Sequence, residues 1–187
     1  MHAITLVTSN EKKAMQFSAW LGFSVERVPI DLPEPQTMDM AEIVRAKASA
    51  AYAALQRPVL VEDTALVFTA LGGLPGPFTK FFLAEGKAEL LCKLASINTD
   101  RSAVYSVWIG YQDEHGLHIV HGEVSGRISE SPSPLTATSF GFDRCFVPDG
   151  HAVPRAELDK EAFEASSARK RAIDILSMWL LENKKIH

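Results

Sequence analysis

The sequence predicts a mixed α/β fold built around one long central sheet that is flanked by helices. Strand-like and helix-like segments alternate over residues 3–61, a pattern typical of strands joined by helical connections. Two strand-like runs, 103–111 and 117–124, then flank a short polar turn and predict a hairpin. The continuous apolar run 59–61 has no polar alternation, which indicates a strand covered on both faces.

The N-terminal part predicts a strand, a helix and a second strand. Residues 3–7 are rich in β-forming side chains and stop at a polar turn. Residues 11–21 place apolar side chains on one helical face, with Asn10 as the expected N-cap and Gly22 as the expected stop. Residues 24–28 then return as a second strand.

A long helix and a buried strand follow. Pro33 and Pro35 force irregular backbone around the glutamate between them. Asp39 has the spacing of a capping box with Glu42 and predicts the start of an Ala-rich helix that reaches about residue 55. The strand that begins at residue 59 is expected to end in the polar triplet 62–64.

The second half of the chain predicts loops and helices around the hairpin. Residues 71–77 contain too much Gly and Pro for a regular element. Two short helices are expected at 78–83 and 88–95, a loop at 131–138, and one long amphipathic helix over about 161–183.

Composition indicates a globular protein and argues against two classes of partner. The 187 residues are 47% apolar and 22% charged, with a net charge of −4. A mildly acidic chain is not expected to bind nucleic acid broadly, because such binding needs a basic surface. No segment approaches the roughly 20 apolar residues of a membrane span. With two cysteines, Cys92 and Cys145, and no export signal, we expect a cytoplasmic protein.

The first candidate site is the polar segment between the first strand and the first helix. Its sequence is Thr8-Ser9-Asn10-Glu11-Lys12-Lys13. Free backbone N–H groups and the helix dipole favour an anion at such a position, and the two lysines add positive charge. The simpler alternative is an Asn cap followed by solvated lysines. The chain has no glycine-rich phosphate loop, no zinc-protease motif and no hydrolase-elbow motif.

Two carboxylates form the second candidate site. Asp63 follows a buried strand, at the edge of the sheet where α/β proteins bind ligands. The adjacent Glu62 points to the opposite face, so one of the two acids faces a given cleft. Glu34 is held rigidly between two prolines, and with Asp63 it would suit Mg²⁺. The alternatives are that the acids solvate a strand end and that Glu34 is an ordinary turn residue.

Lys47 and three histidines need separate interpretations. Lys47 lies within the predicted Ala-rich helix, where a lysine that extends to the surface is the ordinary expectation. His115, His118 and His121 invite a metal interpretation, but their spacing of three in a strand sends neighbouring members to opposite faces. We therefore do not expect the histidines to form one metal site.

In chain order, these segments resemble the inosine triphosphate pyrophosphatase family, also called the non-canonical purine NTP pyrophosphatases. The most specific part is VEDTAL at 61–66 followed by ALGGLPGP at 70–77. Further segments extend the resemblance over nearly the whole chain: Thr8–Lys13, Asp31–Glu34, Ser125–Ile128, Phe140–Asp143 and Phe146–Gly150.

The resemblance implies an elongated α/β fold, related to the Maf-like fold, with two lobes around a central sheet. It implies that residues 1–187 form a single domain with a nucleotide cleft between the lobes, and that the protein is a homodimer. The implied reaction is Mg²⁺-dependent hydrolysis of a nucleoside triphosphate to the monophosphate and pyrophosphate. The implied substrates are the deaminated purine nucleotides ITP, dITP and XTP.

The resemblance also implies a role for each matching position. Glu34 and Asp63 would hold Mg²⁺, and Asp63 would be the catalytic residue that accepts a proton from water. The triphosphate would be held by Thr8, Ser9, Asn10, Glu11, Lys12, Lys13 and Lys47, with Thr64 also in contact with the substrate. The base pocket would be lined by Phe140, Gly141, Phe142, Asp143 and Arg169.

Two departures from the family pattern affect the residues that read the base. Ala168 stands where the family usually has His, and Phe163 stands where it usually has Lys, with Lys160, three residues away, as an alternative for that lysine. The phosphate and metal positions are intact, so the reaction type is expected to hold, while the base preference is open to change or broadening. Two alternatives follow: the same reaction with broad specificity or with modified pyrimidine or ordinary nucleotides as substrates, or a nucleotide-binding protein that has lost catalysis.

Overall fold

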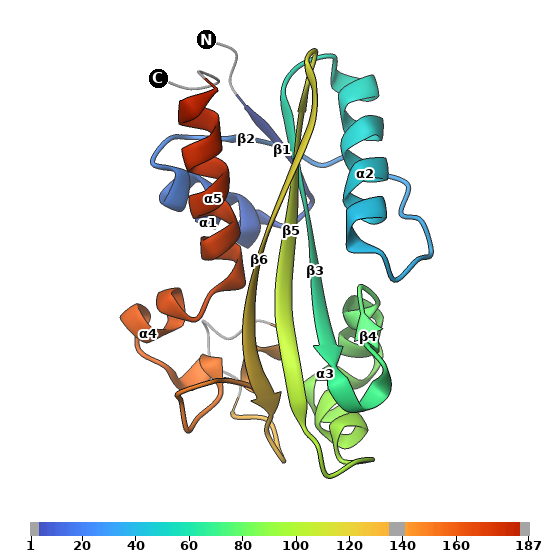
Figure 1. The fold of residues 1–187 in the computed structure, drawn as a ribbon, viewed down its shortest axis with the longest axis vertical. Helices are drawn as coiled ribbons and strands as arrows, with labels where there is room; N and C mark the ends of the chain where they lie inside the picture. The colour runs from blue at the N-terminus through green and yellow to red at the C-terminus, as the bar shows by residue number, and fades with distance from the viewer. Residues whose placement is uncertain (1–3, 135–140, 184–187) are drawn as a thin grey trace. The chain divides into compact units, whose positions relative to one another are not determined.

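A computed structural model describes residues 4–134 and 141–183 (Figure 1), and the chain divides into two compact units. Unit 1 contains Met1–Asp63, Val107–Gly122 and Arg169–His187. Unit 2 contains Thr64–Ser106 and Glu123–Ala168. Three long strands pass from one unit into the other, so each unit is assembled from segments that are distant in the sequence.

The described residues form a seven-stranded mixed sheet, which confirms the predicted mixed α/β class. The order is β2-β1-β3-β5-β6-β7, with β4 paired to β3. β1 runs parallel to β2 and β3, whereas the β3–β4 and β6–β7 pairs are antiparallel. The strands are β1 (Thr5–Val7), β2 (Glu26–Val28), β3 (Val59–Phe68), β4 (Pro75–Gly76), β5 (Ser102–Asp113), β6 (Gly116–Ile128) and β7 (Phe146–Pro148).

Helices account for most of the remaining described chain. The α-helices are α1 (Glu11–Leu21), α2 (Met40–Leu55), α3 (Thr79–Ala95), α4 (Lys160–Ala165) and α5 (Ala168–Glu182). Three short 3₁₀ helices are η1 (Thr69–Leu71), η2 (Gly141–Arg144) and η3 (Arg155–Glu157). Within the described ranges, no helix has the length and apolar character that a membrane crossing requires.

The predicted helix starts in unit 1 are confirmed by their caps. The Asn10 side chain accepts a hydrogen bond from the Lys13 N–H at 3.2 Å, and Gly22 ends α1 in the left-handed conformation. The Asp39 side chain accepts from the Ala41 and Glu42 N–H groups at the start of α2. The Asp39 N–H itself donates to the Thr37 hydroxyl at 3.1 Å, a role that the predicted capping box gave to Glu42.

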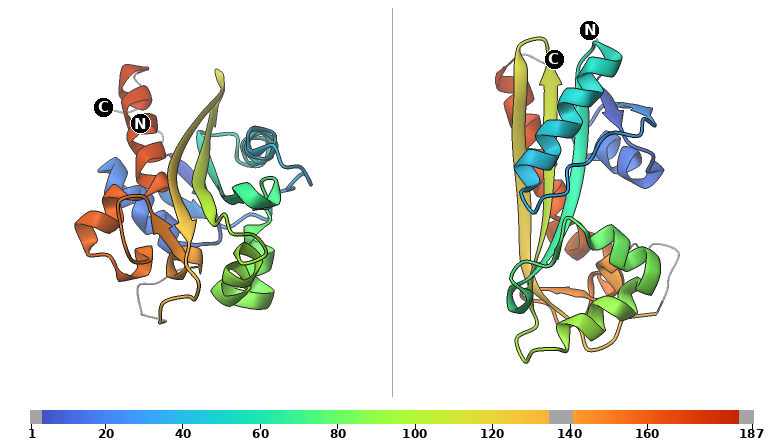
Figure 2. Two further views of the ribbon diagram at one scale, coloured as in Figure 1. Left: turned by 60° about the horizontal axis from the view of Figure 1, so that its bottom comes forward. Right: turned by 90° about the vertical axis from the view of Figure 1, so that its right-hand side faces the viewer.

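In unit 1, helices cover the strands from two sides (Figures 1 and 2). Val44 and Ala48 of α2 pack with Val7, Val59 and Val61 of the strands in one buried cluster. Gly110 of β5 permits this approach, because an ideal Cβ there would lie 2.7 Å from Cγ1 of Val44. The next residue along β5 points to the other face of the sheet.

The other face of the same strands packs against α5. Trp179 of α5 contacts the Tyr111 ring at 5.5 Å between centroids and stacks on His118 at 3.9 Å. His121 instead stacks on Trp108, at 4.4 Å. The histidines therefore pack against different aromatic partners, and the described residues contain no cluster of three or more metal-ligating His, Cys, Asp or Glu side chains.

The prediction that β3 ends at residues 62–64 is wrong. The strand continues through Glu62, Asp63 and Thr64 to Phe68, so Asp63 lies within the strand and not after it. The continuation is stabilised by antiparallel pairing of Leu66 and Val67 with β4. Ion pairs also satisfy the two acids, so their charges do not interrupt the strand.

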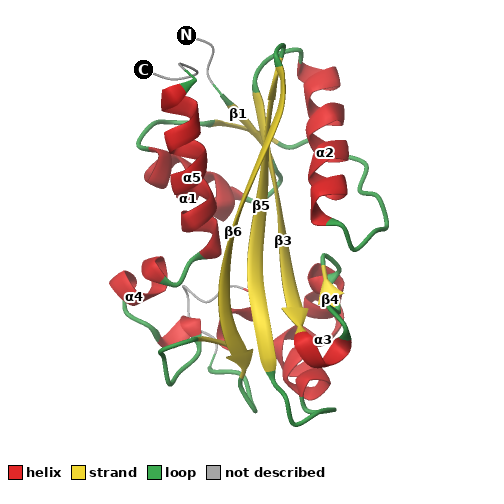
Figure 3. Cartoon of the chain, viewed as in Figure 1, coloured by secondary structure: helices red, strands yellow, loops and turns green. Residues whose placement is uncertain are grey.

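The prediction of one helix over 161–183 is also wrong, because α4 and α5 are separate helices (Figure 3). The break lies at Ser166 and Ser167. The Ser166 hydroxyl donates to the Ala162 carbonyl at 2.7 Å, and the Ser166 carbonyl accepts from the buried Arg155 guanidinium. The Ser166 N–H also donates to the Ala162 carbonyl, at 3.0 Å, so the last helical bond of α4 is kept and the helix ends at this serine.

Elsewhere, the predicted elements differ from the structure mainly in their lengths. The two helices expected at 78–83 and 88–95 are present as the two parts of α3, which are separated by a kink at Lys87, where φ is +54°. The hairpin strands extend beyond both predicted ends, and the Asp113 side chain accepts from the His115 N–H at 2.9 Å in the turn. Residues 135–138 of the predicted loop lie outside the described residues.

The first testable prediction concerns Gly126 of β6, where the backbone of β7 is closest. An ideal Cβ at this position would overlap the Val147 carbonyl oxygen, which is part of the backbone and cannot rotate away. We expect Gly126→Ala to lower the free energy of unfolding by about 1–3 kcal/mol, as overpacking does. Urea unfolding measures the effect, with Ser125→Ala at the exposed neighbouring position as the control. Equal midpoints for the two variants would contradict the prediction.

Candidate active site

Glu34, Lys47 and Asp63 come together in unit 1. The ammonium group of Lys47 lies 3.0 Å from Oε1 of Glu34 and 2.8 Å from Oδ2 of Asp63. Lys47 comes from α2, Asp63 from β3, and Glu34 from the loop that precedes α2. Three residues that the sequence analysis treated as site candidates therefore converge on one point.

Local structure explains why Lys47 reaches the two acids. Ile43, Val44 and Ala48 fix the buried side of α2 against the sheet. Lys47 lies at the edge of that buried side, and its side chain is 12% exposed. The aliphatic part of the side chain is therefore packed, and its ammonium group contacts the two carboxylates. The position of Lys47 in an Ala-rich helix had instead predicted a lysine that extends to the surface.

The Lys47 ammonium stays charged at neutral pH. Burial lowers its pKa, but the negative charge of Asp63 and the hydrogen bonds to Asp63 and Glu34 outweigh burial and raise the pKa above its usual value. The two carboxylates therefore share one positively charged partner in this structure.

The donor set at this point also fits Mg²⁺. Mg²⁺ binds oxygen ligands and typically takes one or two protein carboxylates, together with waters and substrate phosphate oxygens. Glu34 and Asp63 supply two carboxylates whose oxygens already converge on one positive group.

A second ionic cluster surrounds Glu62, whose side chain is only 1% exposed. Lys13 of α1 lies 2.9 Å from one Glu62 oxygen, and Nε of Arg169 lies 2.6 Å from the other. Arg169 also donates from Nη1 to the Gln16 side chain at 2.7 Å. Glu62 therefore joins the start of α1 to the start of α5 through β3.

The charge of Glu62 is stabilised by its two cations. Burial raises the pKa of the Glu62 carboxyl, but the charges and hydrogen bonds of Arg169 and Lys13 more than compensate and hold the pKa far below its usual range. The sequence analysis placed Glu62 on the face opposite Asp63 and gave it no role. The available signal was an acid inside an otherwise apolar strand, because such an acid requires a cationic partner.

The Thr8–Lys13 segment is organised by hydrogen bonds within itself and to β2. The Asn10 N–H donates to the Thr8 hydroxyl at 3.1 Å, and Asn10 caps α1 as expected. Glu11 pairs with Arg27 of β2 at 3.4 Å, while Ser9 and Lys12 are exposed. Within this segment, Lys13 is the residue that the structure joins to Glu62.

The predicted base-pocket residues fall in both units. Arg169 belongs to unit 1, whereas Gly141, Phe142 and Asp143 form η2 in unit 2. Phe140 lies outside the described residues, and Thr64, in β3, is the first residue of unit 2.

In unit 2, two of these candidates take part in packing. Phe142 is buried and meets the ring of Tyr105 edge-on at 4.9 Å between centroids. Asp143 accepts a hydrogen bond from Nε of Arg155 at 2.9 Å. At the two departures, Ala168 is fully buried, and the Phe163 ring lies 4.2 Å from the Arg155 guanidinium carbon.

Comparisons with known proteins match nearly the whole chain. The model of the Ham1 family matches residues 4–179. Inosine triphosphate pyrophosphatase 2 of Trypanosoma cruzi is 39% identical over 176 residues, covering 92% of this chain and 89% of that protein. A dITP/XTP pyrophosphatase of Methanopyrus kandleri is 34% identical over 172 residues, covering 91% and 90%.

Solved structures share the fold. The Ham1 protein of Staphylococcus aureus superposes with a TM-score of 0.84 at 25% identity, covering 97% of this chain and 100% of that one. A HAM1 protein of Coxiella burnetii gives a TM-score of 0.83 at 27% identity, with the same coverage.

The second testable prediction follows from the low pKa of Glu62. At pH 7, Glu62→Gln removes the anion between Lys13 and Arg169, and we expect a loss of about 3–5 kcal/mol in the free energy of unfolding. The contribution of the carboxylate is complete above the unfolded pKa, near 4.5, and decreases as the pH falls below it. The difference between wild type and Glu62→Gln should therefore shrink in acid.

Urea unfolding of both proteins at several pH values between 3.5 and 8 measures this difference. Glu182→Gln, at an exposed acid near the end of α5, is the matched control and should leave stability nearly unchanged. A difference that grows as the pH falls would refute the assignment of Glu62 as a buried anion.

Proposed function

The chain belongs to the Ham1 family, and we propose that it hydrolyses deaminated purine nucleoside triphosphates, ITP, dITP and XTP, to the monophosphate and pyrophosphate. The observation that carries the proposal is the convergence of Glu34 and Asp63 on the ammonium group of Lys47. The names of the matched relatives support the substrate class.

In the proposed mechanism, Glu34 and Asp63 would hold Mg²⁺. When bound, the metal would supply positive charge to the phosphates and lower the pKa of a coordinated water. Asp63 would accept a proton from the attacking water, since a carboxylate on a rigid strand is well placed as a general base. Lys47 and Lys13 bind phosphate oxygens, and the first turn of α1 offers backbone N–H groups to the same charge.

Charge balance explains why the proposed site needs a divalent cation. The two clusters contain the carboxylates Glu34, Glu62 and Asp63 and the cations Lys13, Lys47 and Arg169, so their formal charges cancel. A nucleoside triphosphate brings about four negative charges, which phosphoryl-transfer sites neutralise with cations. A bound Mg²⁺ would supply the positive charge that the paired side chains lack.

Arg169 is our candidate for reading the base. A guanidinium donates hydrogen bonds and accepts none, so it favours a 6-oxo purine over a 6-amino purine. Glu62 and Gln16 hold the Arg169 side chain in one orientation. Gly141 to Asp143, with Phe140 and Thr64, complete the proposed set of substrate-binding residues.

Broad specificity is the second candidate. It is favoured by Ala168 and Phe163, because neither side chain offers the hydrogen-bond donor of the family His or Lys.

A homodimer and a cytoplasmic location remain part of the proposal. The two cysteines are free thiols in the structure, which suits a reducing compartment.

The third testable prediction is the substrate profile. Pyrophosphate release with Mg²⁺ is measured under one condition for ITP, dITP, XTP, ATP, GTP, dUTP and dTTP. We expect kcat/KM for the deaminated purines to exceed that for ATP by about tenfold or more, because one well-placed hydrogen bond discriminates at least this strongly. A flat or pyrimidine-biased profile would favour the second candidate. Absence of turnover with every nucleotide would favour a binding protein without catalysis.

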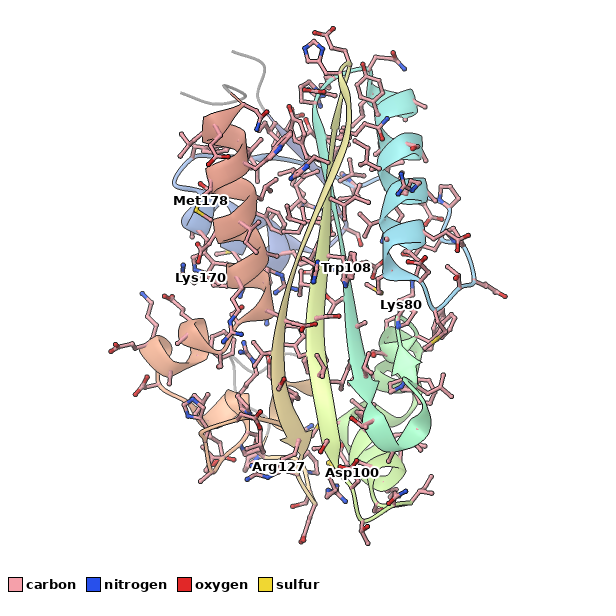
Figure 4. All side chains as sticks on the ribbon, viewed as in Figure 1. Lys80, Asp100, Trp108, Arg127, Lys170 and Met178 are labelled. Atoms are coloured by element: carbon pink, nitrogen blue, oxygen red, sulfur yellow. The ribbon has the colours of Figure 1, made fainter. Side chains whose placement is uncertain are left out.

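The fourth testable prediction concerns Asp63. Asp63→Asn keeps the size of the side chain but removes its basicity and most of its affinity for a metal, and we expect kcat to fall by about 10²–10⁴. The matched control is Asp174→Asn, which should leave kcat unchanged, because Asp174 is exposed and pairs with Lys170 of α5. Figure 4 shows Lys170 on this helix. Full activity of Asp63→Asn would overturn the catalytic assignment.

A further inference from the structure

The position of Lys47 implies an order of binding, an inference that rests on the proposed function. We propose that Lys47 and the divalent cation compete for the carboxylates of Glu34 and Asp63, so that the metal enters the site together with the nucleotide. Without nucleotide, the Lys47 ammonium group pairs with the two carboxylates. When nucleotide is bound, Lys47 pairs with the phosphates, and the two carboxylates can bind the metal.

Lys47 occupies the space between Glu34 and Asp63 that a divalent ion would need. The Lys47 ammonium lies at hydrogen-bonding distance from both acids, 3.0 Å and 2.8 Å. A divalent ion held by the same two residues would need their oxygens to converge on it at about 2.1 Å. The ammonium group and the divalent ion therefore cannot both occupy the small region between Glu34 and Asp63.

Electrostatic repulsion also opposes metal binding at this position. A divalent cation would meet two carboxylates whose charge is already half neutralised, and it would be repelled by the ammonium at close range. The Lys47 side chain is 12% exposed and that of Asp63 is 18% exposed, so water and salt screen this repulsion only in part. Metal binding to the nucleotide-free protein should therefore be weak.

Nucleotide binding would release Lys47 from the two carboxylates. A lysine ammonium on its flexible stem is a good partner for phosphate oxygens and can rotate from one anion to another. A phosphate group near α2 can replace the carboxylates of Glu34 and Asp63 as the anionic partner of Lys47. The metal would arrive with the same phosphates, at two carboxylates that the ammonium no longer contacts.

The test is Mn²⁺ binding to the nucleotide-free protein, because Mn²⁺ prefers the same oxygen ligands as Mg²⁺. Affinity is measured by isothermal titration calorimetry and by the loss of the free-ion electron paramagnetic resonance signal. Competition predicts that Lys47→Met binds Mn²⁺ about tenfold or more tightly than wild type. Unchanged or weaker binding by a folded Lys47→Met protein would overturn the proposal.

Lys13→Met separates competition from a general charge effect. Lys13 is also a lysine of unit 1 in an ion pair, but its partner is Glu62, the residue next to Asp63. Loss of a nearby positive charge alone would strengthen Mn²⁺ binding similarly in the two variants. Competition predicts less than about threefold for Lys13→Met, so equal effects would refute it.

A second measurement uses the wild-type chain and does not depend on the folding of a variant. The rate of Lys47 acetylation by an amine-reactive ester is followed by peptide mass spectrometry, with and without saturating Mn²⁺. Displacement predicts a rate at least about threefold higher with Mn²⁺, whereas Lys170, paired with Asp174 on the surface, should not change. An unchanged Lys47 rate at saturation would refute displacement.

The outcome can be distinguished from a failure of the proposed function. If wild type hydrolyses ITP but Lys47→Met binds Mn²⁺ no more tightly, the order of binding is wrong and the function stands. If no nucleotide is hydrolysed, the function fails whatever the Mn²⁺ affinities are.

Discussion

Two adjacent acids in one buried strand constrain the rest of unit 1. Glu62 and Asp63 are consecutive residues of β3, so the pleat sends their side chains to opposite faces. Glu62 is buried and needs cations, which come from Lys13 of α1 and Arg169 of α5. Asp63 meets Lys47 of α2 on the other face. The ion pairs of Glu62 and Asp63 thus connect these two residues to the three helices α1, α2 and α5.

This constraint explains which features of the fold could be predicted from sequence. Asn10 and Asp39 correctly predict where α1 and α2 begin, because capping is a local interaction between neighbouring residues. The length of β3 could not be read in the same way. Its polar triplet looks like a strand end, and only partners distant in the sequence, such as Arg169, satisfy the charges. The break at Ser166 is equally non-local, because its carbonyl is taken by Arg155.

The candidate site shows the same division between local and distant information. The sequence predicts that Glu34 and Asp63 pair, because one is held between two prolines and the other follows a buried apolar run, and the structure brings them to one point. The side chain found at that point is Lys47. The family resemblance implied that Lys47 binds phosphate, whereas its place in an Ala-rich helix predicted a surface lysine. Contact between Lys47 and both acids depends on the packing of α2 against β3, which no local pattern encodes.

The departure at residue 163 has a packing consequence in unit 2. The Phe163 ring lies over the guanidinium of Arg155, at 4.2 Å, and Tyr105 approaches the same group at 5.4 Å. Arg155 is buried, and its charge is balanced by Asp143. A lysine at position 163 would bring a second cation to this group, whereas an aromatic face attracts the guanidinium. Phe163 therefore stabilises the Arg155–Asp143 pair and, through this pair, the η2 segment.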